Sequence, residues 1–112
     1  MAEPTSEVRW TRAAQRDLGA IVSWIAEDSI GNALDVLDRL QTRAESLSDQ
    51  PERGRFVPEL RLVDVYHYRE LIERPWRLIY RIEGHLVFVM AVLDGRRDLH
   101  SVLIERLVRP SS

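Results

Sequence analysis

The sequence contains no cysteine and no lysine, and it has no long apolar run. Without cysteine the chain forms no disulfide, offers no thiolate to a metal and has no thiol nucleophile, so nothing indicates an oxidising compartment. The longest apolar run, residues 86–93, is far shorter than the roughly 20 residues that a membrane span needs, and the first ten residues show no secretory signal pattern. We therefore expect a cytoplasmic protein that does not enter a membrane.

All 16 basic residues are arginine. Codon usage in a GC-rich genome is sufficient to explain this bias, although arginine also suits bidentate contacts to phosphate and carboxylate. The net charge of −2 is unevenly distributed, because residues 1–50 hold 9 acidic and 5 basic side chains and residues 51–112 hold 9 acidic and 11 basic. An isoelectric point near 5.9 argues against broad, non-specific nucleic-acid binding. An anionic partner would therefore meet a local patch in the C-terminal half.

The length and composition predict one folded domain over residues 1–112. Of these residues 45% are apolar and 30% are charged, which is ordinary for a globular protein. The stretch from Asp49 to Pro58 contains Pro51, Gly54 and Pro58 among charged residues, which indicates a loop. It is not a domain linker, because neither side holds enough sequence for a separate core.

The first half of the chain predicts a strand followed by two helices. Val8–Trp10 is the strand, and Thr11 is a suitable N-cap for a helix over about residues 12–27. Residues 28–31 form a turn that ends this helix. A second apolar series with steps of four and three follows, at Ala33, Leu37, Leu40, Ala44 and Leu47. The two helices are therefore expected to lie antiparallel, as a helical hairpin.

The second half predicts three strands and a short C-terminal helix. The strands are residues 65–72, 76–82 and 86–93, joined by turns at 73–75 and 83–85. Even-numbered positions of the second strand are apolar and two of its odd positions are arginine, while the third strand is apolar on both faces, as an interior strand is. Apolar positions between Leu99 and Leu107 indicate the helix. The fold class is α+β, with the helical hairpin packed on a small antiparallel sheet.

Three segments carry a resemblance to a known family. They are PERGRFVPEL, RELIERPWRLIYRI and AVLDGRRD, which follow the strand and two helices in this order and spacing from Trp10 to Asp98. The chain resembles the RelE/ParE superfamily of bacterial toxins over nearly the whole domain. The resemblance implies the toxin of a type II toxin-antitoxin system, which a cognate antitoxin holds inactive in a hetero-oligomer. Growth inhibition is expected when the toxin is released.

The superfamily contains two mechanisms, and the resemblance implies different site residues for each. RelE-like toxins cut messenger RNA on the ribosome with basic residues of the sheet, and at the matching positions this chain has Arg69, Arg77 and Arg97. These arginines suit a phosphate whose charge grows during the reaction. The tyrosine of that branch corresponds to Leu103, and a second basic strand position corresponds to Leu71. His100 is the one remaining candidate for acid/base catalysis, and the sequence shows no partner to orient it.

ParE-like toxins instead block DNA gyrase and lack this catalytic set. The departures from the nuclease pattern, the acidic isoelectric point and the long helical hairpin favour this branch. On this interpretation no catalytic residue is named, and the arginines are structural or contact an anionic partner or target. They are Arg69, Arg77, Arg96 and Arg97. A detoxified relative that only binds an antitoxin is a further alternative.

Other predictions concern single residues. Trp24 lies off the main apolar stripe of the first helix, and the family resemblance implies that an antitoxin helix or strand covers such a surface. The three histidines are scattered and match no metal motif, and no glycine-rich phosphate loop is present, so neither a metal nor a cofactor is implied.

Simpler roles are open for several of the charged and aromatic residues. Arg69 with Glu70, and Arg77 or Arg81 with Glu83, are candidates for cross-strand ion pairs. Asp98 is expected to cap the C-terminal helix, and Tyr80 is expected to pack in the core.

Overall fold

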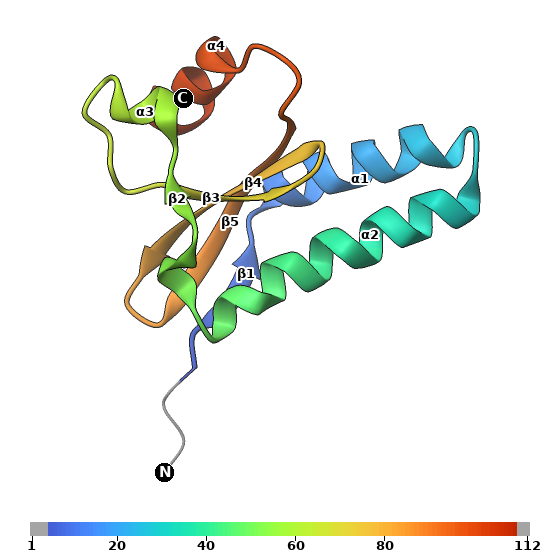
Figure 1. The fold of residues 1–112 in the computed structure, drawn as a ribbon, viewed down its shortest axis with the longest axis horizontal. Coiled ribbons are helices and arrows are strands. Elements are labelled where there is room, and N and C mark those ends of the chain that lie inside the picture. The colour runs from blue at the N-terminus through green and yellow to red at the C-terminus, as the bar shows by residue number, and fades with distance from the viewer. Residues whose placement is uncertain (1–4, 110–112) are drawn as a thin grey trace.

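The computed structural model describes residues 5–109 (Figure 1). Its strands are β1 (Glu7–Trp10), β2 (Arg55–Phe56), β3 (Arg69–Glu73), β4 (Trp76–Glu83) and β5 (Leu86–Asp94). Its α-helices are α1 (Arg12–Ala26), α2 (Ile30–Glu45), α3 (Pro58–Arg61) and α4 (His100–Leu103). Two 3₁₀ turns, η1 (Ser46–Ser48) and η2 (Pro51–Arg53), follow α2, and a π-helical turn, η3 (Ile104–Val108), extends α4. The α+β class is confirmed. Within the described residues no helix is long and apolar enough to cross a membrane.

The five strands form one mixed sheet in the order β1-β5-β4-β3-β2. The four later strands pair antiparallel, but β1 runs parallel to β5, with Glu7 opposite Leu86 and Trp10 opposite Val89. The predicted purely antiparallel sheet is therefore corrected at its first strand. Between β1 and β5 the chain passes through the helical hairpin and the other three strands. This long connection lets β5 run parallel to β1. β5 is an interior strand, as predicted.

Side-chain caps fix the ends of the helical hairpin. The Thr11 hydroxyl accepts a hydrogen bond from the Ala14 backbone N–H at 3.2 Å, so Thr11 is the N-cap that the sequence predicts. Ser29 caps α2 in the same way through the N–H of Asn32 at 3.1 Å. The turn between the helices is consequently shorter than predicted, and Ile30 begins α2.

Both faces of the sheet are covered. The hairpin packs on one face, where Leu18 and Leu40 meet Leu78 and Tyr80 of β4. On the other face α3, α4 and η3 enclose a second core around Ile79; its buried members are Val57, Leu60, Tyr68, Ile79, Ala91, Leu99, Leu103 and Leu107. Figure 1 shows the hairpin and the α3–α4 layer on opposite sides of the strands. The alternation predicted for the second strand is therefore confirmed.

The segment before β3 differs from the prediction. Pro58 starts the short helix α3, and residues 62–68 turn back from it, with Asp64 at a positive φ of 62°. The strand predicted over residues 65–72 therefore begins at Arg69 and not at residue 65. Tyr68 is buried beneath this turn, where its hydroxyl donates to the Leu107 carbonyl at 3.1 Å.

A β-bulge and an ion pair fasten the C-terminal turn to α1. Ile79 pairs with Ala91 and Tyr80 with Val89, so Met90 is the extra residue of the bulge. Arg106 donates to the Met90 carbonyl at 3.1 Å and pairs with Asp17 of α1 at 3.0 Å. Asp17 also accepts from the Val92 N–H at 3.0 Å. The pairing of β5 with β1 ends at Val89. Arg106 and Asp17 therefore supply hydrogen bonds to the backbone of β5 at Met90 and Val92, beyond the end of β1.

Candidate functional site

A groove of about 840 Å³ lies between α3, the β3–β4 turn and the loop after β5. Its charged lining residues are Arg55, Glu59, Arg74, Arg77, Arg96 and His100. The Gly95 N–H donates to the Pro75 carbonyl at 2.8 Å, which holds the two turns against each other. A Cβ at Gly95 would lie 3.0 Å from the Arg77 Cγ, so the loop packs closely on the stem of that side chain. The fold thus brings together Arg77, Arg96 and His100 of the predicted site.

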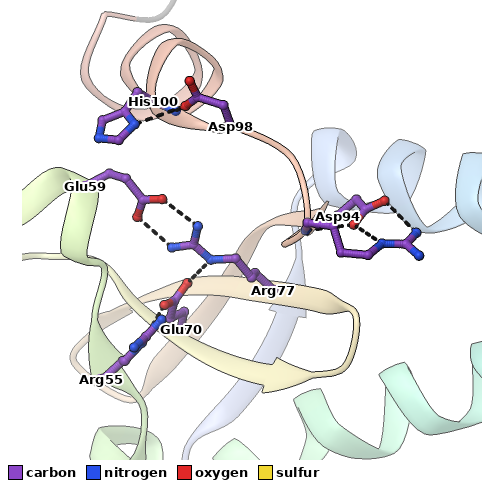
Figure 2. Close-up of polar contacts among 8 residues, drawn as sticks. Arg55, Glu59, Glu70, Arg77, Asp94, Asp98 and His100 are labelled. Atoms are coloured by element: carbon purple, nitrogen blue, oxygen red, sulfur yellow. Dashed lines mark hydrogen bonds and ion pairs between the residues drawn. The ribbon is translucent and has the colours of Figure 1, made fainter.

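Arg77 lies at the floor of this groove and is bound by two carboxylates (Figure 2). Its two terminal nitrogens donate to the carboxylate oxygens of Glu59 at 2.6 and 2.7 Å, and its Nε donates to Glu70 at 2.7 Å. The second oxygen of Glu70 accepts from the Nε of Arg55 at 2.7 Å. Arg77 is only 8% exposed and Glu70 only 1%, so the network is largely removed from water.

The pairing of Glu59 with Arg77 favours the charged form of both residues. The hydrogen bonds from Arg77 lower the pKa of Glu59 below its ordinary value, despite the opposing effect of burial. The hydrogen bond to Glu59 raises the pKa of Arg77 further above its ordinary value. Glu59 and Arg77 are therefore ionised throughout the physiological range. Each of the three guanidinium nitrogens of Arg77 donates one hydrogen bond to these carboxylates, so within this structure Arg77 belongs to an ion-pair network, and its contact to an anionic partner stays a prediction.

Arg69 lies on the opposite face of the sheet from Arg77. Successive side chains of a strand point to opposite faces of the sheet. Glu70, the next residue after Arg69 in β3, binds Arg77, so Glu70 and Arg77 share a face and Arg69 lies on the other one. Arg69 donates to the carbonyls of Glu52 and Gly54 at 3.1 and 2.9 Å, and it stacks on the Phe56 ring at 4.3 Å. Among the described residues its partners are thus backbone groups and a ring, so the predicted Arg69–Glu70 ion pair is wrong.

Of the other predicted cross-strand ion pairs, one is confirmed and one is not. Arg81 donates to Glu83 at 3.2 Å, so this ion pair is confirmed, whereas Arg77 does not reach Glu83. Tyr80 is fully buried, as predicted; its hydroxyl donates to the Pro51 carbonyl at 2.7 Å and accepts from the Gly54 N–H at 2.9 Å.

The loop after β5 carries the two arginines of the sequence motif. Arg96 donates to the Asp94 carboxylate through its backbone N–H, its Nε and a terminal nitrogen, all at 2.9–3.0 Å. These hydrogen bonds lower the pKa of Asp94 to about 2. Arg97 is exposed and lies outside the groove lining, and within residues 5–109 its side chain makes no hydrogen bond or ion pair.

His100 has an orienting partner that the sequence interpretation missed. Its Nδ1 lies 3.1 Å from Asp98 Oδ1, and the same carboxylate accepts from the His100 backbone N–H at 3.2 Å. Asp98 thus binds the first N–H of α4, but the N-cap position is Leu99 and not Asp98 as the sequence predicts. The hydrogen bonds from His100 lower the pKa of Asp98. Both side chains are exposed. The Asp-x-His spacing was the signal available in the sequence.

Replacing Arg96 by alanine is expected to raise the pKa of Asp94 from about 2 most of the way to 3.8, because two of three hydrogen bonds to the carboxylate are lost. The folded pKa is depressed, so Asp94 stabilises the protein above pH 3.8, and this contribution disappears as the pH falls toward 2. Wild type and variant should differ in urea stability at pH 7 and converge near pH 2. A carboxyl-carbon NMR titration measures the pKa directly. A wild-type value near 3.8 would contradict the expectation.

The predicted antitoxin-contact residue, Trp24, lies in α1 and is not among the residues that line the groove. Figure 1 shows α1 on the other side of the sheet from α3. Trp24 is 63% exposed, and two more large apolar residues of the hairpin, Ile30 and Leu34, are exposed as well. Within residues 5–109 no three histidine or carboxylate side chains gather in a way that could hold a metal ion.

Comparison with known proteins identifies the family. The family described as the ParE toxin of type II toxin-antitoxin systems, parDE, matches residues 8–99, which run from β1 to the start of α4. The chain belongs to the ParE toxin family. Membership of the RelE/ParE superfamily, and with it the role of a type II toxin, is thereby confirmed.

Relatives of this ParE-family chain carry both names of the superfamily. It is 30% identical over 94 residues to Toxin ParE3 of Caulobacter vibrioides, covering 83% of this chain and 90% of that protein. It is 33% identical over 93 residues to Toxin RelE2 of the same organism, covering 82% and 98%.

Solved structures with the same fold include the following two. A chromosomal ParDE system from P. aeruginosa superimposes with a TM-score of 0.66 at 22% identity, over 82% of this chain and 98% of that one. The RelBE2 toxin-antitoxin complex from Mycobacterium tuberculosis gives 0.60 at 22% identity, over 80% and 98%.

Proposed function

We propose that this chain is a ParE-like toxin that inhibits DNA gyrase by binding to it and has no catalytic group of its own. The observation that carries the proposal is the state of Arg77. This residue matches the strand arginine of the nuclease branch, and here Glu59 and Glu70 occupy its guanidinium from two sides. An arginine so bound has no free fork to offer to a scissile phosphate.

The other positions of the nuclease pattern support the same branch. Arg69 is on the opposite face of the sheet from Arg77, so the two cannot act on one phosphate. Leu103, at the position of the nuclease tyrosine, is fully buried in the core between the sheet and α4. Leu71, at the second basic position, is also buried, under the helical hairpin.

A ribosome-dependent endoribonuclease is the second candidate, and one observation favours it. The Asp98 carboxylate holds the His100 ring, and carboxylate-oriented histidines serve as general acids and bases. His100 also lines the groove beside Arg96. Against this stands the absence of a free arginine fork at Arg77.

A cognate antitoxin is the proposed regulatory partner. The two solved structures compared above come from a ParDE toxin-antitoxin system and a RelBE2 toxin-antitoxin complex. The exposed apolar residues of the hairpin, Trp24 among them, form a surface that an antitoxin segment would cover in a hetero-oligomer. The gene beside this one is expected to encode that antitoxin.

The target is tested by inducing the toxin without its antitoxin and following the incorporation of labelled thymidine and labelled amino acid in the same culture. Early loss of DNA synthesis with continued translation is expected, since gyrase inhibition acts first on DNA. Early loss of translation would instead identify the endoribonuclease. Loss of neither would identify a detoxified relative.

Replacing His100 by alanine is expected to leave toxicity within about twofold of wild type, because the proposed mechanism uses no acid/base group. Growth inhibition after graded induction measures the effect, and Ser101→Ala, at the adjacent exposed position of α4, is the matched control. Removal of a general acid or base usually costs 10²–10⁴ in rate, so a loss of toxicity in a folded His100→Ala protein would support the endoribonuclease.

A further inference from the structure

The groove beside α3 combines exposed apolar side chains with exposed cations. Leu62, just after α3, is 79% exposed, and Ile72 of β3 is 37% exposed. Both line the groove that also contains Arg74 and Arg96. Apolar anchors inside a polar rim are the composition of a protein docking surface.

The cations of this groove differ in whether they are already neutralised. Arg77 is bound to Glu59 and Glu70, and Arg96 is bound to Asp94. Arg74, in the β3–β4 turn, is exposed and makes no hydrogen bond or ion pair with any residue of the described range 5–109. A partner that covers Arg74 must supply a carboxylate or phosphate, because a cation that loses water without a counter-charge is strongly disfavoured.

The surrounding carboxylates favour a polypeptide over a nucleic acid as that partner. A nucleic-acid backbone binds where several cations are free to neutralise consecutive phosphates. Glu59 in this groove, and Glu70 and Asp94 beside it, already hold the neighbouring arginines, so few free cations are left for consecutive phosphates. An acidic polypeptide needs only a single carboxylate near Arg74 and an apolar side chain near Leu62.

We propose that this groove is the surface through which the toxin docks on gyrase, and that it receives an acidic segment of gyrase whose apolar side chain packs on Leu62 and Ile72. The inference rests on the proposed function and adds to it the surface and the chemistry of the partner. The α3 wall of the groove lies across the sheet from the α1–α2 hairpin (Figure 1), and Trp24 belongs to α1, so antitoxin and gyrase contacts are separable by mutation.

Arg74→Glu tests the charged part of the proposal. Binding of the purified toxin to immobilised gyrase subunits, without DNA, is measured by surface plasmon resonance at several salt concentrations. The variant is expected to associate about tenfold more slowly at low salt and to show a weaker salt dependence, because a rim charge acts mainly on the association rate. Arg16→Glu is the matched control; Arg16 is exposed on α1, has no ion pair within residues 5–109, and its replacement changes the net charge equally.

Leu62→Ala tests the apolar part. The expected effect is a dissociation rate about fivefold faster, as for truncation of an interface anchor. Leu34→Ala is the control, since Leu34 is 58% exposed on α2. Thermal melts of all four variants should lie close to that of the wild type, because each changed side chain is exposed.

The outcomes separate the inference from the proposed function. Weaker gyrase binding by both groove variants, and by neither control, supports the docking surface. Wild-type toxin that neither binds gyrase nor inhibits supercoiling overturns the proposed function and the inference together. Wild-type toxin that inhibits gyrase, with both groove variants equally active, overturns the groove alone. If Arg74→Glu instead lost affinity only for RNA or DNA, the polypeptide assignment would be overturned.

Discussion

Replacement of Arg77 by methionine is expected to lower the free energy of unfolding by about 3–5 kcal/mol. The change removes the cation between Glu59 and Glu70 and leaves Glu70, which is 1% exposed, with only the exposed Arg55 as partner. A buried carboxylate without its main counter-ion carries a large desolvation cost. Methionine has a similar length and apolar stem, so loss of packing contributes little. Urea unfolding followed by circular dichroism at pH 7 measures the change.

Two further variants separate the charge effect from a general effect of mutating β4. Arg81→Met removes the partly exposed ion pair with Glu83 on the same strand, and a change of about 0–1 kcal/mol is expected. The double variant Arg77→Met/Glu70→Met removes the stranded carboxylate together with the cation, so it should be more stable than Arg77→Met alone. If the double variant were less stable than the single one, the unpaired charge would not be the cause.

Replacement of Gly54 by alanine is expected to destabilise the protein by at least about 3 kcal/mol. A Cβ at this position would lie 2.5 Å from the Tyr80 hydroxyl oxygen and 2.6 Å from the Glu70 backbone carbonyl oxygen. Neither atom can move away easily. Tyr80 is fully buried and its hydroxyl is hydrogen-bonded to the Pro51 carbonyl, and the Glu70 carbonyl belongs to a strand of the sheet. The backbone of Gly54 is extended, with φ of −76°, so the cost is steric and not conformational.

Gly19 is the matched control for this substitution. It lies inside α1, and a Cβ there would have no atom of another part of the chain within 4 Å. Gly19→Ala should therefore stabilise the protein by about 0.5–1 kcal/mol through helix propensity and a less flexible unfolded chain. Thermal melts of the two variants measured together provide the comparison. Equal stabilities of Gly54→Ala and wild type would show that the η2 segment rearranges without cost.

The local elements of this fold could be predicted from the sequence, because each depends on neighbouring residues. Thr11 caps α1 through a group only three residues away, and the apolar spacing of both helices follows from one turn to the next. The alternation in β4 likewise placed Leu78 and Tyr80 on one face and Ile79 on the other. Family membership rested on such local segments in a fixed order.

The candidate site could be predicted only in part. Arg77, Arg96 and His100 do line one groove, but the sequence pattern alone gave no sign that Glu59 and Arg74 join them. The partner of Arg77, Glu59, lies 18 residues away in α3, a helix that the sequence interpretation did not predict. Arg69 looked equivalent to Arg77 because both are arginines on strands, and only the strand register puts them on opposite faces.

What the sequence by itself determined is the helical hairpin, the later strands, their order and the family, since periodicity, caps and turns act over a few residues. The tertiary structure decided the rest: that β1 lies parallel to β5, that Arg77 is neutralised, and that Arg74 stays free on the rim of the groove. These outcomes depend on which distant groups the fold brings within hydrogen-bond distance. An arginine has the same side chain in either role, and its surroundings decide whether it stabilises the fold or remains available to a partner.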